Sequence, residues 1–170
     1  DQDGPENGAR MLLPGRNAAL TEDYAWDYAI WAEGWTPGVY VPGDEAPVQI
    51  DTELVIISDP GQSKITIRVP RAVLGDDPEN WAYAVVVLGQ EGFPSSGVWR
   101  VRDVSVTAEQ WRFGGAPTNT ANHPRILDVV WPAGGPVFTQ AEALSDYPPA
   151  TDLVGLTPDD FAQLPMFVVP

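Results

Sequence analysis

The sequence of 170 residues contains no cysteine and a single histidine, His123. The absence of cysteine excludes thiol catalysis, disulfide bonds, cysteine-ligated zinc and iron–sulfur clusters. It does not decide the compartment, because many bacterial extracellular proteins also lack cysteine.

Basic residues are scarce. Nine lysines and arginines face 24 acidic residues, which leaves a formal net charge of −15. Such a surface repels nucleic-acid phosphates and anionic lipids, so the composition argues against both partners. The acidic residues are spread along the chain and therefore indicate a solvated surface, not an acidic tail.

Long hydrophobic runs are also missing. The longest, Trp81–Leu88, has the length of a strand and is far shorter than the ~18 apolar residues of a membrane span. The sequence therefore predicts no membrane insertion. It begins at Asp1 without Met and without a secretion signal, and we expect the chain to be processed or to be part of a longer one.

What is abundant is turn-forming sequence: 16 glycines and 18 prolines make up one fifth of the chain, while hydrophobic residues make up 44%. This composition favours one turn-rich β domain spanning residues 1–170. The strict alternation in Lys64–Val69 predicts a strand with one buried face, and the apolar run Trp81–Leu88 predicts a strand buried on both faces. Further strands are expected at Trp26–Ala32, Val48–Ile57, Val98–Val106 and Ile126–Val130.

Helix signals are few and short. Thr139 and Glu142 have the spacing of a capping box, Thr157-Pro158 is typical of a helix start, and Arg71–Leu74 precedes a glycine. Strands with short peripheral helices predict an all-β, antiparallel, immunoglobulin-like β-sandwich. Because the first 25 residues look like loop, this sandwich would have an unpaired edge. We expect the missing strands to come from an upstream segment or from a second chain.

The evidence for catalysis is weak. A Ser-His-Asp triad would need His123, but the sequence has no Gly-x-Ser-x-Gly motif, and we interpret His123 as a loop histidine bonded to nearby backbone. A glycosidase needs two carboxyl groups facing each other across a cleft, whereas the acidic pairs here are neighbours in turns and helix starts. They are Glu22/Asp23, Asp44/Glu45, Asp76/Asp77 and Asp159/Asp160. The chain is therefore predicted not to be an enzyme.

Two binding sites can be suggested from residue types. The segment from Asp1 to Gly8 spaces the oxygen ligands Asp1, Asp3 and Asn7 between glycines, a pattern that suits Ca²⁺, although no EF-hand glutamate follows. A solvated acidic turn is the alternative. Among seven tryptophans, Trp26, Trp81 and Trp99 are expected in the core. The candidates for exposure, and thus for stacking on sugar rings, are Trp31, Trp35 and Trp131.

An ordered series of short motifs covers nearly the whole chain. It comprises Pro14–Ala18, Trp26–Ile30, Ile67–Gly75, Trp81–Tyr83, Val87–Gly92, Arg100–Arg102, Trp111–Gly115, Ile126–Val129, Thr139–Tyr147 and Leu164–Met166. In this order the motifs resemble the C-terminal, surface-layer-homology-like module of glucodextranases and related pullulanases, a DOMON-like β-sandwich. In that family further strands precede the segment matched by Asp1–Ala18. The sequence contains no hydrolase domain, so specificity for α-glucans does not carry over.

The resemblance implies a non-catalytic accessory module, extracellular or at the cell surface, that binds carbohydrate or anchors its protein to a cell-envelope polymer. Two alternatives remain open. One is a structural envelope or filament subunit that assembles through an open sheet edge. The other is a fragment of a larger glycoside hydrolase whose carboxylate pair another chain would complete.

Overall fold

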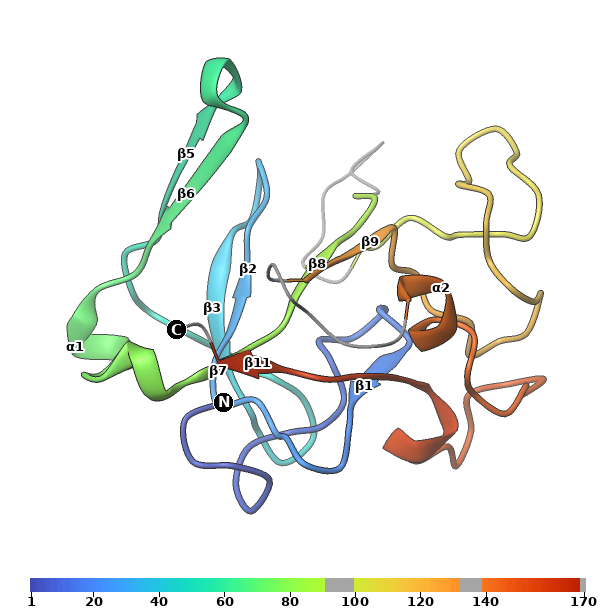
Figure 1. The fold of residues 1–170 in the computed structure, drawn as a ribbon, viewed down its shortest axis with the longest axis horizontal. Coiled ribbons are helices and arrows are strands. Elements are labelled where there is room, and N and C mark those ends of the chain that lie inside the picture. The colour runs from blue at the N-terminus through green and yellow to red at the C-terminus, as the bar shows by residue number, and fades with distance from the viewer. Residues whose placement is uncertain (91–99, 132–138, 169–170) are drawn as a thin grey trace.

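The computed structural model describes residues 1–90, 100–131 and 139–168. These residues form short strands joined by long turns, with a few single-turn helices (Figure 1). None of the described helices is long and apolar enough to cross a membrane. The strands are β1 Ala18–Leu20, β2 Ala29–Trp31, β3 Gly38–Val41, β4 Val48–Ile50, β5 Val55–Asp59, β6 Lys64–Arg68, β7 Ala82–Tyr83, β8 Val85–Val87, β9 Asp128–Val130, β10 Ala162–Leu164 and β11 Phe167–Val168. The expected all-β class is confirmed.

Strand pairing is mainly antiparallel. β2, β3 and β4 form a meander and β5 pairs with β6, whereas the pairs β8–β9 and β7–β11 join strands far apart in the sequence. The one parallel pair among the described strands is β1 with β10, with Ala18 opposite Ala162 and Leu20 opposite Leu164. All of these four residues are fully buried. The strands therefore form several small ladders, and the β1–β10 pair lies in the interior of the protein.

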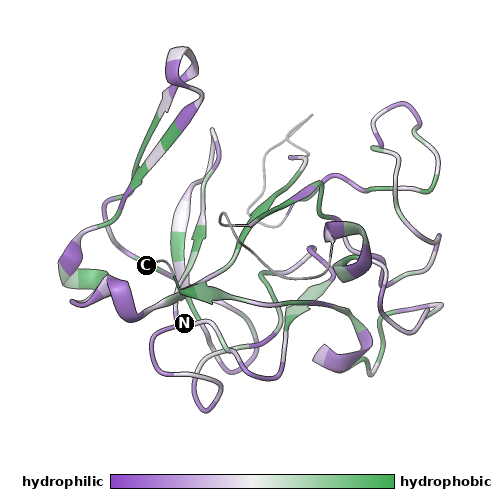
Figure 2. Cartoon of the chain, viewed as in Figure 1, coloured by the Kyte–Doolittle hydropathy of each residue, from purple (hydrophilic) through white to green (hydrophobic). Residues whose placement is uncertain are grey.

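The predicted strand Val48–Ile57 is two strands, because the chain leaves the sheet between Ile50 and Val55. The second of them, β5, forms with β6 a hairpin that projects from the rest of the molecule (Figure 1). Apolar and polar residues alternate along β6 as the sequence predicts (Figure 2). The expected burial of its apolar face is wrong, however, because Ile65 and Ile67 are 69% and 41% exposed.

Trp81–Leu88 also divides into two strands. β7 pairs with β11, and β8 pairs with β9 in a different ladder. Burial on both faces was expected, but Val85 and Val87 are 51% and 45% exposed, and only the face of Val86 packs on buried residues. In the predicted strand Val98–Val106, residues 98 and 99 lie outside the described residues, while Val101 and Val104 form isolated bridges.

The helix predictions are confirmed in position. α1 spans Arg71–Leu74, α2 spans Gln140–Ala143 and the 3₁₀ turn η3 spans Pro158–Asp160. The side chains of Thr139 and Glu142 form the reciprocal hydrogen bonds of a capping box, and Thr157 and Asp160 form a second one. Two further 3₁₀ turns, η1 Pro60–Gln62 and η2 Pro78–Asn80, follow aspartates.

Two groups of buried side chains make up the core. One contains Trp26, Trp31 and Tyr40 beside Leu20. The other gathers Ile126, Val129 and Leu144 around Ala18 and Leu164. β1 thus contributes side chains to both groups.

Candidate functional site

Trp35 lies in the turn between β2 and β3 and is 61% exposed. The side chain of Glu33 organises this turn. Its Oε2 accepts a hydrogen bond from the Trp35 backbone amide at 2.7 Å, and its Oε1 accepts bonds from the backbone amide and the hydroxyl of Thr36. Gln90 donates a further bond to Oε2 from the chain that follows β8. The indole is therefore presented to solvent from a turn whose backbone is held in place.

The same hydrogen bonds set the ionisation of Glu33. Partial burial acts to raise its pKa, but the donors on Gln90, Trp35 and Thr36 stabilise the carboxylate more strongly, so the net pKa of Glu33 lies below its ordinary value. The Glu33 carboxylate is consequently charged at neutral pH and accepts hydrogen bonds from Trp35, Thr36 and Gln90.

Trp31 is not exposed as expected, and this part of the prediction is wrong. Its side chain is only 6% exposed and belongs to the core. The guanidinium of Arg16 lies over its ring, with Cζ 4.1 Å from the ring centre. Burial lowers the pKa of Arg16 to about 10, with Tyr40 opposing the shift, so the group remains charged at neutral pH. A sugar ring has no access to this indole.

Trp131 is half-buried at the end of β9. Its ring meets Phe167 of β11 edge-on, with ring centres 5.1 Å apart and an interplanar angle of 79°. It also packs against the second group of core residues. Sugar binding by Trp131 stays a prediction, and most of its contacts are with the protein interior.

Of the three tryptophans expected in the core, one is buried, one is half-buried and one lies outside the described residues. Trp26 is 4% exposed and its indole nitrogen donates to the Met11 carbonyl at 2.7 Å, which confirms the expectation. Trp81 is half-buried beside Tyr83, at a distance of 6.4 Å between ring centres. Trp99 lies outside the described residues.

Trp111, which was not among the tryptophans predicted to bind sugar, is 66% exposed. It lies at the tip of a two-residue turn in which Glu109 and Arg112 exchange backbone hydrogen bonds of 3.3 and 3.1 Å. Its φ is 69°, in the left-handed region. Neither Gly nor Asn marks this turn, so the usual sequence signal for the conformation was absent.

The acidic turn at the start of the chain brings together a different set of ligands from the one predicted. Carboxylate oxygens of Asp1, Asp3 and Asp27 lie within 4.8 Å of one another. Asn7 instead turns its amide nitrogen to Asp3, donating to Oδ2 at 2.9 Å. The sequence could not place Asp27, which comes from a separate loop. Calcium binding stays a prediction, with Asp27 as the third carboxylate.

His123 is 8% exposed and both of its ring nitrogens face oxygen atoms. Nδ1 lies 2.6 Å from the backbone oxygen of Thr120, and Nε2 lies 3.0 Å from Oδ1 of Asp103. The contact with Thr120 is the local backbone bond that the sequence analysis expected. Because a backbone carbonyl occupies the position where a triad would place a hydroxyl nucleophile, the arrangement fits a structural role.

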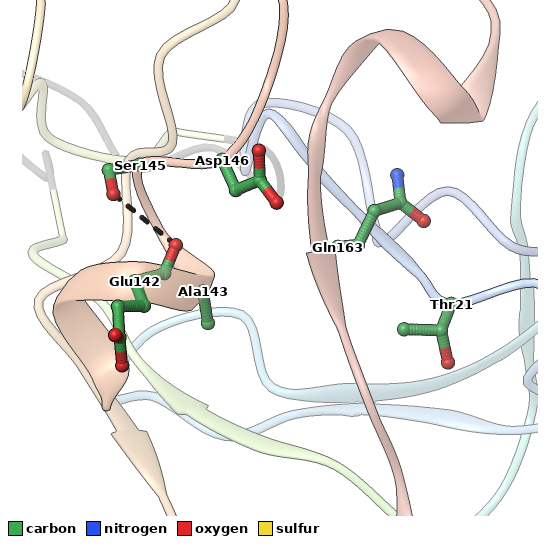
Figure 3. Close-up of a pocket in the computed structure, with 6 residues that line it drawn as sticks. All are labelled: Thr21, Glu142, Ala143, Ser145, Asp146 and Gln163. Carbon is green, nitrogen blue, oxygen red and sulfur yellow. Dashed lines mark hydrogen bonds between the residues drawn. The ribbon is translucent and has the colours of Figure 1, made fainter. Parts of the chain in front are cut away.

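A pocket of about 570 Å³ lies between α2 and β10 (Figure 3). No aromatic side chain is among its lining residues, which are Thr21, Glu142, Ala143, Ser145, Asp146 and Gln163. The amide of Gln163 donates to the backbone oxygens of Pro158 and Phe161 and accepts from Arg10. The Gln163 amide is therefore engaged in contacts within the protein.

Trp35 and Trp111 are thus exposed aromatic residues on turns with backbone hydrogen bonds. In a comparison with protein families, the family described as the SLH-like C-terminal binding module of glucodextranase matches residues 1–157. The chain belongs to this family. Searches of curated proteins and of solved structures find no significant match. Membership of the family, whose members are described as binding modules, supports a non-catalytic role for the chain.

Proposed function

We propose that this chain is a non-catalytic module that binds a glycan or a cell-envelope polymer, as part of a secreted or cell-surface protein. The observation that carries the proposal is Trp35. Of the three tryptophans predicted to stack on sugars, it is the one whose ring is mostly exposed, and four hydrogen bonds to Glu33 fix the surrounding turn.

The arrangement suits a sugar for a physical reason. A pyranose ring has an apolar face that packs on an indole, and its hydroxyl groups need polar partners at the ring edge. A turn that is ordered before binding reduces the entropy lost when the ligand binds. The excess of acidic residues disfavours phosphorylated polymers, so we expect a neutral polysaccharide.

The test measures retention of the protein during affinity electrophoresis in gels that contain dextran, pullulan, xylan or mixed-linkage β-glucan, together with co-sedimentation with purified peptidoglycan sacculi. The wild-type chain is expected to be retained by at least one polymer. Trp35→Ala should lose about tenfold in affinity, whereas Trp35→Tyr, which keeps a flat ring, and Val154→Ala, at a residue that is 87% exposed, should be retained. No retention of the wild type on any polymer would refute the proposal.

Assembly through a sheet edge is a second candidate, favoured by the β5–β6 hairpin. Among the described residues neither strand has a partner on its outer side, and Ile57, Ile65 and Ile67 are exposed. Lys64 and Arg68 place charges on β6 that disfavour pairing of its edge with another chain. Along Val55–Ser58, β5 has no charged residue and no proline to disfavour such pairing. Association that rises with concentration in analytical ultracentrifugation and is lost in Ile57→Lys would support this function.

A further inference from the structure

The turn that carries Trp111 has a backbone conformation that tryptophan rarely adopts. A bulky residue in the left-handed region costs about 1–2 kcal/mol relative to glycine, and Trp111 has a φ of 69° while 66% of its surface remains exposed. An exposed indole gains little from burial that could offset this cost. Strain of this kind, kept at an exposed aromatic residue, is typical of a functional position.

The ring of Trp111 is also held in position. The guanidinium of Arg102 lies between two aromatic rings, with Cζ 5.6 Å from the centre of Trp111 and 5.8 Å from the centre of Phe113. Phe113 in turn packs over Gly89, where an added Cβ would lie 2.4 Å from Cε2 of the ring. Arg102 thus lies against the Trp111 indole, while 66% of the residue stays exposed.

The residues that contact Trp111 and those that order the Trp35 turn are linked to two adjacent residues, Gly89 and Gln90. Gly89 accepts a hydrogen bond from the backbone amide of Arg102 and contacts Phe113. Its neighbour Gln90 donates to the Glu33 carboxylate that orders the Trp35 turn. The loops that carry the two most exposed tryptophans of the described chain therefore contact adjacent residues, Gly89 and Gln90.

We propose that Trp35 and Trp111 form one extended site, which binds a chain of several neutral sugar residues and not a single sugar. The inference rests on the proposed function and adds the second platform and the length of the ligand. The charges around Trp111 are balanced: Arg112 lies 3.8 Å from Glu109 and 4.0 Å from Asp103. This balance gives no net attraction for an anionic polymer, while the carboxylates and guanidinium groups can bind hydroxyls.

The experiment uses the full chain and the polysaccharide that retains the wild type in the gels described above. Affinities are measured by isothermal titration calorimetry for that polymer and for its di- and hexasaccharide. The variants are Trp35→Ala, Trp111→Ala, the double variant, and Trp111→Tyr as the ring-keeping control. Trp111→Gly removes the ring and also the backbone strain, so it separates loss of stacking from distortion of the turn. Melting temperatures show that each variant is folded.

One extended site predicts that both single alanine variants and Trp111→Gly each lose about tenfold in affinity for the hexasaccharide and the polymer. Trp111→Tyr should bind within about threefold of the wild type. The hexasaccharide should bind much more tightly than the disaccharide, and this advantage should disappear in either alanine variant.

The possible failures are distinguishable. If Trp35→Ala weakens binding but Trp111→Ala and Trp111→Gly do not, the extended site is wrong and the proposed function stands. Equal affinity for the di- and hexasaccharide also overturns the extended site. If the wild type binds none of the polymers, both the proposed function and the extended site are refuted.

Discussion

The side-chain amide of Asn122 donates a hydrogen bond of 2.6 Å to the backbone oxygen of Asp160, 38 residues further along the chain. It donates a second bond to Pro148 at 2.8 Å, and its oxygen accepts one from the Ala150 amide at 2.9 Å. Asn122 is fully buried. One side chain thus satisfies three backbone groups and holds the irregular segment after α2 in place.

Replacing Asn122 with alanine should therefore destabilise the protein by about 3 kcal/mol, since it leaves buried backbone groups without hydrogen bonds. Urea unfolding monitored by tryptophan fluorescence measures the change. Asn119→Ala is the matched control, because Asn119 is exposed and makes a single bond of 3.4 Å to the Val106 amide. Equal effects of the two substitutions would show that the buried network contributes no more than a surface contact.

Trp31 and Trp35 are four residues apart and should respond in opposite ways. Trp31→Ala removes a buried ring and should cost about 3–5 kcal/mol of stability. Trp35→Ala should change the stability by less than about 0.5 kcal/mol, because most of its ring is in water. Thermal unfolding followed by circular dichroism distinguishes the two. A large loss of stability in Trp35→Ala would mean that its ring is covered in solution.

The stability of the β2–β3 turn should depend on pH through Glu33. Its folded-state pKa is below the ordinary value because of the hydrogen bonds that it accepts, so its contribution is present above the unfolded pKa of about 4.3 and is lost as the pH falls through the folded value. We expect Glu33→Gln to lower the melting temperature at pH 7 and to have a smaller effect at about pH 3. The pair of melting curves at each pH tests this, and a difference that grows on acidification would contradict the assignment.

A chain that ends where the family match ends should not fold. The match stops at residue 157, but β10 spans Ala162–Leu164 and is the partner of β1. Removing it exposes the fully buried Leu20 and deletes Leu164. We expect residues 1–157 to lack near-ultraviolet circular dichroism and a cooperative melt, whereas residues 1–168 should show both. A cooperative transition in the shorter chain would show that the β1–β10 pair is dispensable.

Local features of this fold could be predicted from the sequence. The capping boxes at Thr139 and Thr157 depend on side chains three residues apart, and the alternation in Lys64–Arg68 depends on neighbours within one strand. By contrast, β1 and β10 are only three residues long and have no pattern of their own. Only their pairing makes them strands, and a single sequence does not contain that information.

The residues of the candidate site could likewise be predicted only where local sequence determines their environment. Trp35 lies in a turn that glycine and proline mark in the sequence, and its exposure was expected. Trp31 has a similar sequence context, but the alternation along β2 points its ring inward, beneath Arg16. Trp111 could not be found because its conformation is one that tryptophan rarely adopts. The grouping of Asp27 with Asp1 depends on how two loops meet.

The parallel pairing of β1 with β10 also has a consequence for synthesis. The ribosome makes β10 about 140 residues after β1, so the two strands cannot pair until almost all of this module has left the exit tunnel. Throughout that time the apolar Ala18-Ala19-Leu20 segment has an unpaired edge that can bind other chains. We therefore expect nascent copies of this module to depend on chaperones more than its small size would indicate.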